Sequence, residues 1–162
     1  MGTRGLIIIV YDGRFIVLYN RYDSDPTKLG RKLVMEMKEL LEKHTIIEIK
    51  ELLNNIKHIS GCNNDILPTE DEKEKLKIFS ENTNKHNTWL DLLRKCEGSI
   101  LKIIESGYAI IQDDIKNIEN HGYMQIEYEY QLNLDEDLLL CNNVFICRLS
   151  NVVNENDLLF CL

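Results

Sequence analysis

The sequence predicts an α+β fold: an antiparallel sheet made from an N-terminal hairpin and C-terminal strands, with about five central helices packed on one face. Three observations predict it. Apolar runs at 6–11 and 14–19 flank a turn dipeptide, and apolar and polar residues alternate strictly through 122–132. Between these regions, apolar residues recur at helical spacing. Because a two-stranded hairpin is barely stable alone, both ends of the chain are expected to share one sheet.

The hairpin is predicted by Asp12-Gly13, which lies between the two apolar runs. A type I′ turn needs a positive φ at both central residues, and Asp-Gly is a preferred pair there. Residues 7–10 are all apolar, so both faces of the first strand are expected to be covered. That strand is therefore predicted to be central in the sheet.

The central helices are predicted from apolar spacing and from caps. The first spans 27–43, with Asp25 as its N-cap before Pro26. The second spans 45–56 and begins with a capping box that Thr45 opens. Shorter helices are predicted from Thr69 (capping box with Glu72), from Asn87 or Thr88 to Gly98, and over 99–106 with Gly107 as C-terminal cap.

The C-terminal part of the chain returns to strands. After a turn at 135–137, short strands are predicted over 138–141 and 144–149, around the turn Asn142-Asn143. The last five residues, 158–162, are too apolar for a free tail and are expected to dock on the fold.

Length and composition predict a single domain spanning 1–162, with a mass of 19.0 kDa. The apolar runs are much shorter than the ~18 residues that a membrane span needs, and no secretory leader is expected. Five cysteines without CxxC spacing indicate reduced, mostly buried thiols and a cytoplasmic location. A zinc site at Cys141, Cys147 and a histidine is disfavoured by its spacing. No metal or other cofactor is therefore expected.

The net charge of −8 is unevenly distributed along the chain. Residues 121–162 carry one basic and seven acidic side chains, whereas charges in 1–80 cancel. Such an acidic C-terminal third disfavours contact with a phosphate backbone, so nucleic-acid binding is not expected. Basic residues between Arg4 and Lys32 leave one weaker alternative, and we interpret them as solvated side chains balanced by neighbouring acids.

One end of the hairpin is the candidate site, because an antiparallel return brings residues 20–24 back beside the start of the first strand. The residues that meet there are Arg4, Tyr19, Asn20, Tyr22, Asp23 and Ser24. In one interpretation, Arg4 pairs with Asp23 and fixes the hairpin end to the first helix, while Asn20 and Ser24 satisfy loop backbone groups. In another, Arg4 holds an anionic ligand against tyrosine walls.

No catalytic residue can be assigned from the sequence. The histidines (His44, His58, His86 and His121) stand at no recognisable motif spacing. The sharpest enzymatic hypothesis concerns Thr3, whose hydroxyl would act as an N-terminal nucleophile after removal of the preceding residues. Trp89, the only tryptophan, is interpreted as a core anchor in preference to a ligand-stacking residue.

Two patches carry a resemblance to a known family. The first is Gly2-Thr3-Arg4-Gly5, with Leu18-Tyr19-Asn20-x-x-Asp23-Ser24-x-Pro26-x-x-Leu29-Gly30. The second is Glu127-Tyr128-Glu129-Tyr130-x-Leu132-x-Leu134-Asp135, in which Asn133 stands where an acid is usual. Together they resemble an uncharacterised family of small proteins from fungi and large (giant) DNA viruses. The resemblance implies a viral protein in the host cytoplasm or the virion, and it implies no established activity.

We therefore expect a binding, interaction or scaffold module with a protein partner, which could be a second copy of the chain. The alternatives are a small hydrolase that uses Thr3 and a binder of small anions at the Arg4/Asp23 end of the hairpin.

Overall fold

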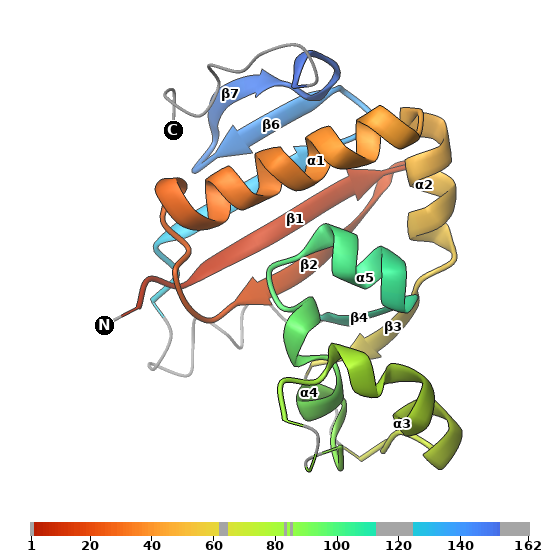
Figure 1. Ribbon diagram of the computed structural model, residues 1–162. Helices are drawn as coiled ribbons and strands as arrows, with labels where there is room; N and C mark the ends of the chain where they lie inside the picture. Colours follow the sequence, from red (N-terminus) through yellow and green to blue (C-terminus); the bar gives the residue numbers. More distant parts are fainter. Residues whose placement is uncertain (1, 62–64, 83, 85, 113–124, 153–162) are drawn as a thin grey trace.

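A five-stranded sheet in the order β2-β1-β5-β6-β7 lies at the centre of the computed structural model (Figure 1). The structure describes residues 2–61, 65–82, 84, 86–112 and 125–152. The fold class is α+β, as predicted. The strands are β1 (Gly5–Tyr11), β2 (Arg14–Asn20), β5 (Tyr128–Asn133), β6 (Leu138–Cys141) and β7 (Val144–Arg148).

Both predicted tight turns are confirmed. Asp12 and Gly13 have φ values of 51° and 70°, and Asn142 and Asn143 have 49° and 63°. Positive φ at both central residues identifies type I′ turns, whose twist matches that of the flanking strands. The prediction that the first strand is central is also confirmed, since β1 lies between β2 and β5.

The pairing of β1 with β5 differs from the fully antiparallel sheet that we expected. These two strands run parallel, in register from Gly5↔Tyr128 to Val10↔Asn133, and the other pairs in the sheet are antiparallel. A parallel pair needs a long crossover connection. The chain between β2 and β5 provides one, and the alternation of residues in a strand does not encode its direction.

The described residues between β2 and β5 contain five α-helices, and the predicted caps are present at their ends. Asp25, Thr45, Thr69, Thr88 and Ser99 each accept a hydrogen bond from a backbone N–H of the first turn, and Gly107 has a left-handed φ of 74°. The helices are α1 (Arg31–Lys43), α2 (Ile46–Asn54), α3 (Glu70–Leu76), α4 (Trp89–Leu92) and α5 (Ile100–Ser106).

Three segments differ from their predictions or lie outside the described residues. The first predicted helix begins with a π-helical turn, Pro26–Gly30, before α1. The strand predicted to start at Gly122 is β5, which begins at Tyr128 in the structure. Residues 122–124 of the predicted strand lie outside the described residues. The apolar segment 158–162, which was expected to dock, also lies outside the described part of the chain.

A small second sheet was not predicted. It contains β3 (Lys57–Ser60) and β4 (Tyr108–Ile111), which pair in parallel with Lys57 directly beside Tyr108. The backbone N–H of Gln112, just after β4, donates to the carbonyl of Val17 at 2.8 Å. The small sheet is therefore attached to the β2 edge of the large one.

The two faces of the large sheet are covered differently. Figure 1 shows α1 lying across one face, with α5 on the same side. We call this the inner face; most of its side chains are buried in one hydrophobic core with residues of α1, α2 and α5, and the buried ones include Ile7, Ile9, Tyr11, Ile16, Leu18, Tyr130, Leu132 and Leu139. The prediction that helices pack on one face therefore holds for α1 and α5, whereas α3 and α4 lie below the small sheet (Figure 1).

The opposite face, which we call the outer face, is defined by the cross-strand register, because directly paired residues project to the same side. Its buried apolar cluster contains only Leu6 and Val17, with Ile8, Tyr19 and Ile126 packed against them, and none of these residues lies in a helix. The rest of the face is formed by Val10, Phe15, Glu129, Gln131, Asn133, Leu138, Leu140, Phe145 and Arg148.

Candidate functional site

The loop after β2 folds back onto the residues that precede β1. The backbone N–H of Ser24 donates to the carbonyl of Thr3 at 3.2 Å, and the N–H of Asp25 donates to Oγ1 of Thr3 at 3.1 Å. Both acceptor groups of Thr3 therefore hold the loop that leads into the first helix. These contacts are structural, and nothing in their geometry favours a nucleophilic role for the Thr3 hydroxyl.

Asn20 and Ser24 form the centre of this region and are both buried. The amide Nδ2 of Asn20 donates to the hydroxyl of Ser24 at 2.8 Å and to the carbonyl of Tyr22 at 2.5 Å. The Ser24 hydroxyl donates in turn to the carbonyl of Asn20 at 3.3 Å. Through these bonds, the side chains of Asn20 and Ser24 satisfy backbone carbonyls of the loop, as one of the two sequence-based interpretations expected.

Two glycines allow the loop to pack this closely. A Cβ added to Gly5 would lie 2.7 Å from Cβ of Ser24, and one added to Gly98 would lie 2.2 Å from Oδ1 of Asn20. Gly98 also has a φ of 65°, which disfavours any other residue. The glycines thus let three separate parts of the chain meet around Asn20 and Ser24.

Tyr130 joins this loop to the centre of the sheet. Its hydroxyl donates to the carbonyl of Ser24 at 2.8 Å, and the tyrosine is only 1% exposed. Burial raises the pKa of Tyr130, so its hydroxyl stays a neutral donor. We call the interlocked set of Thr3, Gly5, Asn20, Ser24 and Tyr130 the strand-end lock.

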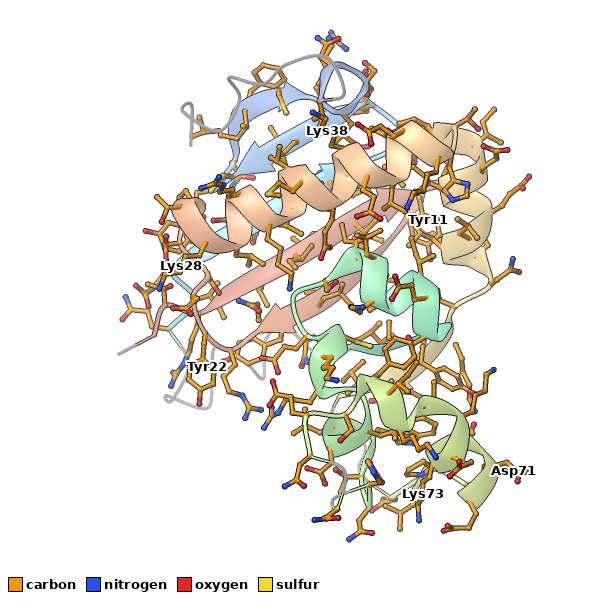
Figure 2. The ribbon with its side chains drawn as sticks, viewed as in Figure 1. Tyr11, Tyr22, Lys28, Lys38, Asp71 and Lys73 are labelled. Carbon is orange, nitrogen blue, oxygen red and sulfur yellow. The ribbon has the colours of Figure 1, made fainter. Side chains whose placement is uncertain are left out.

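The other candidate residues lie around the strand-end lock rather than in it. Asp23 adopts a φ of 56°, and its Oδ1 accepts from Nζ of Lys28 at 2.6 Å. We expected Arg4 to pair with Asp23; the structure shows an ion pair of Asp23 with Lys28, which the turn at Pro26 brings back over the loop. Tyr22 is 65% exposed, and Figure 2 shows it at the same end of the molecule as Lys28.

Arg4 and Tyr19 are half-buried beside the strand-end lock. Burial raises the pKa of Tyr19, and the positive charges of Arg4 and Arg21 oppose this effect. Tyr19 also lines a cavity of about 50 Å³ whose other walls are mostly apolar and include Leu93 and Cys96. The six candidate residues therefore come together in space, but only Asn20 and Ser24 are fully enclosed.

A groove of about 260 Å³ opens next to the strand-end lock and is lined by Asn20, Tyr22, Glu81, Arg94 and Glu97. Glu97 accepts from the backbone N–H of Arg21 at 2.6 Å and pairs with Arg94 at 3.3 Å. With two carboxylates and one guanidinium, this groove does not favour an anionic ligand. Sequence reasoning missed Glu97, whose position after a helix end gave no signal.

The second patch of the resemblance also has a structural role. Both carboxylate oxygens of Asp135 accept backbone N–H bonds from the hairpin turn, those of Asp12 and Gly13, each at 2.9 Å. Lys50 of α2 lies 2.6 Å from Asp135, and these contacts lower the pKa of that carboxyl to about 2. Asn133 accepts from the N–H groups of the next turn, where an acid would serve equally well.

Sequence reasoning also missed a polar contact between helices. Glu36 of α1 is buried, and its carboxylate accepts from the Ser99 hydroxyl at 2.7 Å and from the N–H of Ile100 at 2.8 Å. A carboxylate is well placed at the N-terminus of a helix, so Glu36 ties α1 to α5. The signal was present, because Glu36 lies between apolar positions of an amphipathic helix.

Two kinds of feature, a metal site and a membrane-spanning helix, are absent from the described residues. Across the described ranges, no three acidic, histidine or cysteine side chains come together in a way that could hold a metal ion. No helix in the part of the chain that the structure describes combines the length and the apolar character of a membrane span.

Comparison of the chain with known protein families, with curated proteins and with solved structures gave no match.

Proposed function

We propose that the protein is an interaction module that binds a second copy of itself through the outer face of the five-stranded sheet. The observation that carries this proposal is the exposure of two phenylalanines on that face. Phe15 is 64% exposed and Phe145 is 56% exposed. Large apolar side chains that gather on one exposed face mark an interaction surface more often than an accident of folding.

The cross-strand register gives each of these phenylalanines an apolar neighbour on the outer face. Phe15 pairs with Val10, and Phe145 pairs with Leu140, so each aromatic ring has a half-buried aliphatic neighbour on the same face. Between these two apolar flanks lies the polar face of β5, with Gln131 at its middle. The outer face therefore has the same apolar–polar–apolar pattern from either edge.

This symmetry favours a second copy as the partner. A two-fold interface must be self-complementary, because the same patch lies on both sides of it. The strand residues of the outer face include one carboxylate, Glu129, and one guanidinium, Arg148, so two copies can meet there without net repulsion.

The buried polar motif supports the same proposal indirectly. Asn20 and Ser24 bond to each other inside the strand-end lock, so we assign this motif a role in the fold rather than in binding a ligand. We place the protein in the cytoplasm as part of the proposal, since Cys96, Cys141 and Cys147 are not in disulfide bonds. Nucleic acid is not proposed as a partner.

The test is the oligomeric state of three proteins, measured by sedimentation velocity over a range of concentrations. The wild type is expected to form a dimer, and the double variant Phe15→Ser/Phe145→Ser is expected to be monomeric. The matched control is Ile47→Ser, because Ile47 is 70% exposed but lies on α2, away from the outer face. A wild type that remains monomeric at the highest concentration would overturn the second copy as the partner.

A further inference from the structure

The side chains of Lys57, Glu72, Trp89 and Tyr108 form a cluster at the end of the molecule that contains α3 and α4, far along the chain from the strand-end lock. They come from β3, α3, α4 and β4. In Figure 1, α3 and α4 lie below the small sheet, away from β6 and β7. The neighbouring residue Lys73 marks this end of the molecule in Figure 2.

Two aromatic rings provide the walls of the cluster. Trp89 and Tyr108 stack with their ring centroids 5.4 Å apart and their planes at 25°. The ammonium group of Lys57 lies 5.5 Å from the centroid of each ring. At that distance, the negative faces of both rings attract a cation. The parallel pairing of β3 with β4 places Lys57 beside Tyr108 and so brings the cation to the rings.

A fixed carboxylate completes the cluster. Oε2 of Glu72 accepts from the N–H and the hydroxyl of Thr69, in the capping box that begins α3. Oε1 is directed instead at the cluster, where it accepts from Lys57 at 2.9 Å and from the Tyr108 hydroxyl at 3.2 Å. The salt bridge to Lys57 and the capping bonds lower the pKa of Glu72 to about 2, so this carboxylate is charged at neutral pH.

We propose that Glu72, Trp89 and Tyr108 form a binding site for an alkylammonium group, and that Lys57 occupies this site in the free protein. Two aromatic faces with one carboxylate are the chemistry by which proteins recognise methylated and quaternary ammonium groups. Lysine provides a cation of this kind, although its compact ammonium is strongly hydrated.

Lys57 is suited to leave the site. Its side chain is 56% exposed, whereas that of Glu72 is 18% exposed and Trp89 is 6% exposed. A long, flexible and solvated side chain contributes little to stability through an exposed ion pair. The walls are thus buried or half-buried while the Lys57 ammonium lies at the surface, which is the arrangement expected when an internal cation can be exchanged for an external one.

Two buried polar atoms beside the cluster have no hydrogen-bond partner within the residues that the structure describes. The indole N–H of Trp89 and Nδ1 of His86, three residues earlier, are buried and have no hydrogen-bond partner among the described residues. Buried polar atoms without partners are rare in folded proteins, because each costs free energy. Nearly all other buried polar side chains in the described part of the chain are paired.

The test is a titration followed by tryptophan fluorescence, which reports this site alone because Trp89 is the only tryptophan in the chain. The probes are tetramethylammonium chloride, acetyl-trimethyllysine amide, and sodium chloride at matched ionic strength. In Lys57→Ala, both ammonium probes are expected to produce a saturable change with an apparent Kd about tenfold lower than in the wild type. Lys57→Gln, which keeps much of the stem without the charge, should behave like Lys57→Ala.

Two further variants separate a binding site from a purely structural cluster. Lys57→Ala/Glu72→Gln should lose the saturable change while it keeps the helix cap, since glutamine also completes a capping box. Lys43→Ala removes an exposed lysine that pairs with Glu39 at 2.7 Å on another helix, and it should titrate like the wild type.

The relative affinities of the probes identify the source of the ammonium group. Equal affinities mean that the head group alone is recognised, as for a free quaternary amine, and tighter binding of the lysine derivative indicates a side chain of another protein. A fluorescence response that is linear and identical in all the variants would overturn the proposal, and so would equal affinities in wild type and Lys57→Ala. Neither result would depend on the dimer proposed above, which is measured on a different surface.

Discussion

The inner and outer faces of the five-stranded sheet are built from alternate residues of the same strands, yet their environments differ. In β1, the inner residues Ile7 and Ile9 are 0% and 1% exposed, whereas on the outer face only Leu6 is buried and Ile8 and Val10 are half-buried. The side chains are chemically alike. The difference in exposed fraction therefore comes from α1 and α5, which cover only the inner face. Apolar residues on both sides of a strand do not reveal which face the fold leaves accessible.

In β5 the two faces differ in chemistry as well as in burial. Tyr130 and Leu132 face the helices and are buried, whereas Gln131 and Glu129 face outwards and are half-buried. This alternation is typical of an antiparallel strand with one solvated face. The outer face is consequently apolar at its flanks and polar at its centre, which is the pattern that the proposed dimer uses.

The largest expected difference between the faces is in the free energy of unfolding. Leu132→Ala should lower it by about 2–5 kcal/mol, because Leu132 is fully enclosed on the inner face and the substitution leaves a cavity. The same change at Leu140, which is half-buried on the outer face of the adjacent strand, should cost about 1 kcal/mol. Urea denaturation of both variants measures these values, and equal losses would contradict the assignment of the two faces.

A smaller effect is expected from the hydrogen bond that joins the inner face to the strand-end lock. Tyr130→Phe removes the donor to the Ser24 carbonyl and leaves that buried acceptor unpaired, so the free energy of unfolding should fall by about 1–3 kcal/mol.

Tyr22→Phe is the control for Tyr130→Phe, because Tyr22 is exposed and its hydroxyl can bond to water. It should change stability by less than about 0.5 kcal/mol. If Tyr130→Phe were equally silent, the strand-end lock would not be held by this bond.

The smallest effect concerns Asp135, whose carboxylate holds the Asp12-Gly13 turn between β1 and β2. The pKa of Asp135 falls from 3.8 to about 2 on folding, so the folded state binds a proton at this carboxyl less readily than the unfolded state. Its stabilising contribution is present above pH 4 and is lost as the pH falls towards 2. Asp135→Asn should therefore weaken the dependence of stability on pH in this range.

The control for Asp135→Asn is Glu129→Gln, which removes one negative charge from the outer face without touching the turn. Thermal unfolding of the wild type and both variants between pH 2 and pH 5 compares them. An unchanged acid dependence in Asp135→Asn would mean that the turn does not need the carboxylate.

The features that could be predicted from the sequence are local ones. Asp12-Gly13 and Asn142-Asn143 specify type I′ turns, because few residues tolerate positive φ. Thr45 and Thr69 specify helix starts, because their hydroxyls can bond the N–H groups that a first turn leaves free. Each of these features depends on four or five adjacent residues, so the information lies within one short stretch.

The candidate site could be located from the sequence but not interpreted. The sequence placed Asn20 and Ser24 beside the start of β1, because an antiparallel hairpin must return there. It could not show that Gly98, more than seventy residues later, closes against Asn20, or that Tyr130 bonds to Ser24. Those contacts convert a possible pocket into an enclosed lock, and they depend on the packing of distant segments.

By itself, the sequence determined the α+β class, the hairpin, the helix caps and the use of both chain ends in one sheet. These follow from backbone conformations and from hydrogen bonds between near neighbours. Only the tertiary structure decided that β1 and β5 run parallel, that Phe15 and Phe145 stay exposed on the face opposite α1 and α5, and that Lys57 meets two aromatic rings and a carboxylate. The physical reason is that such contacts join residues far apart in the chain, where many pairings satisfy the same local preferences and only the packing of the whole core selects one.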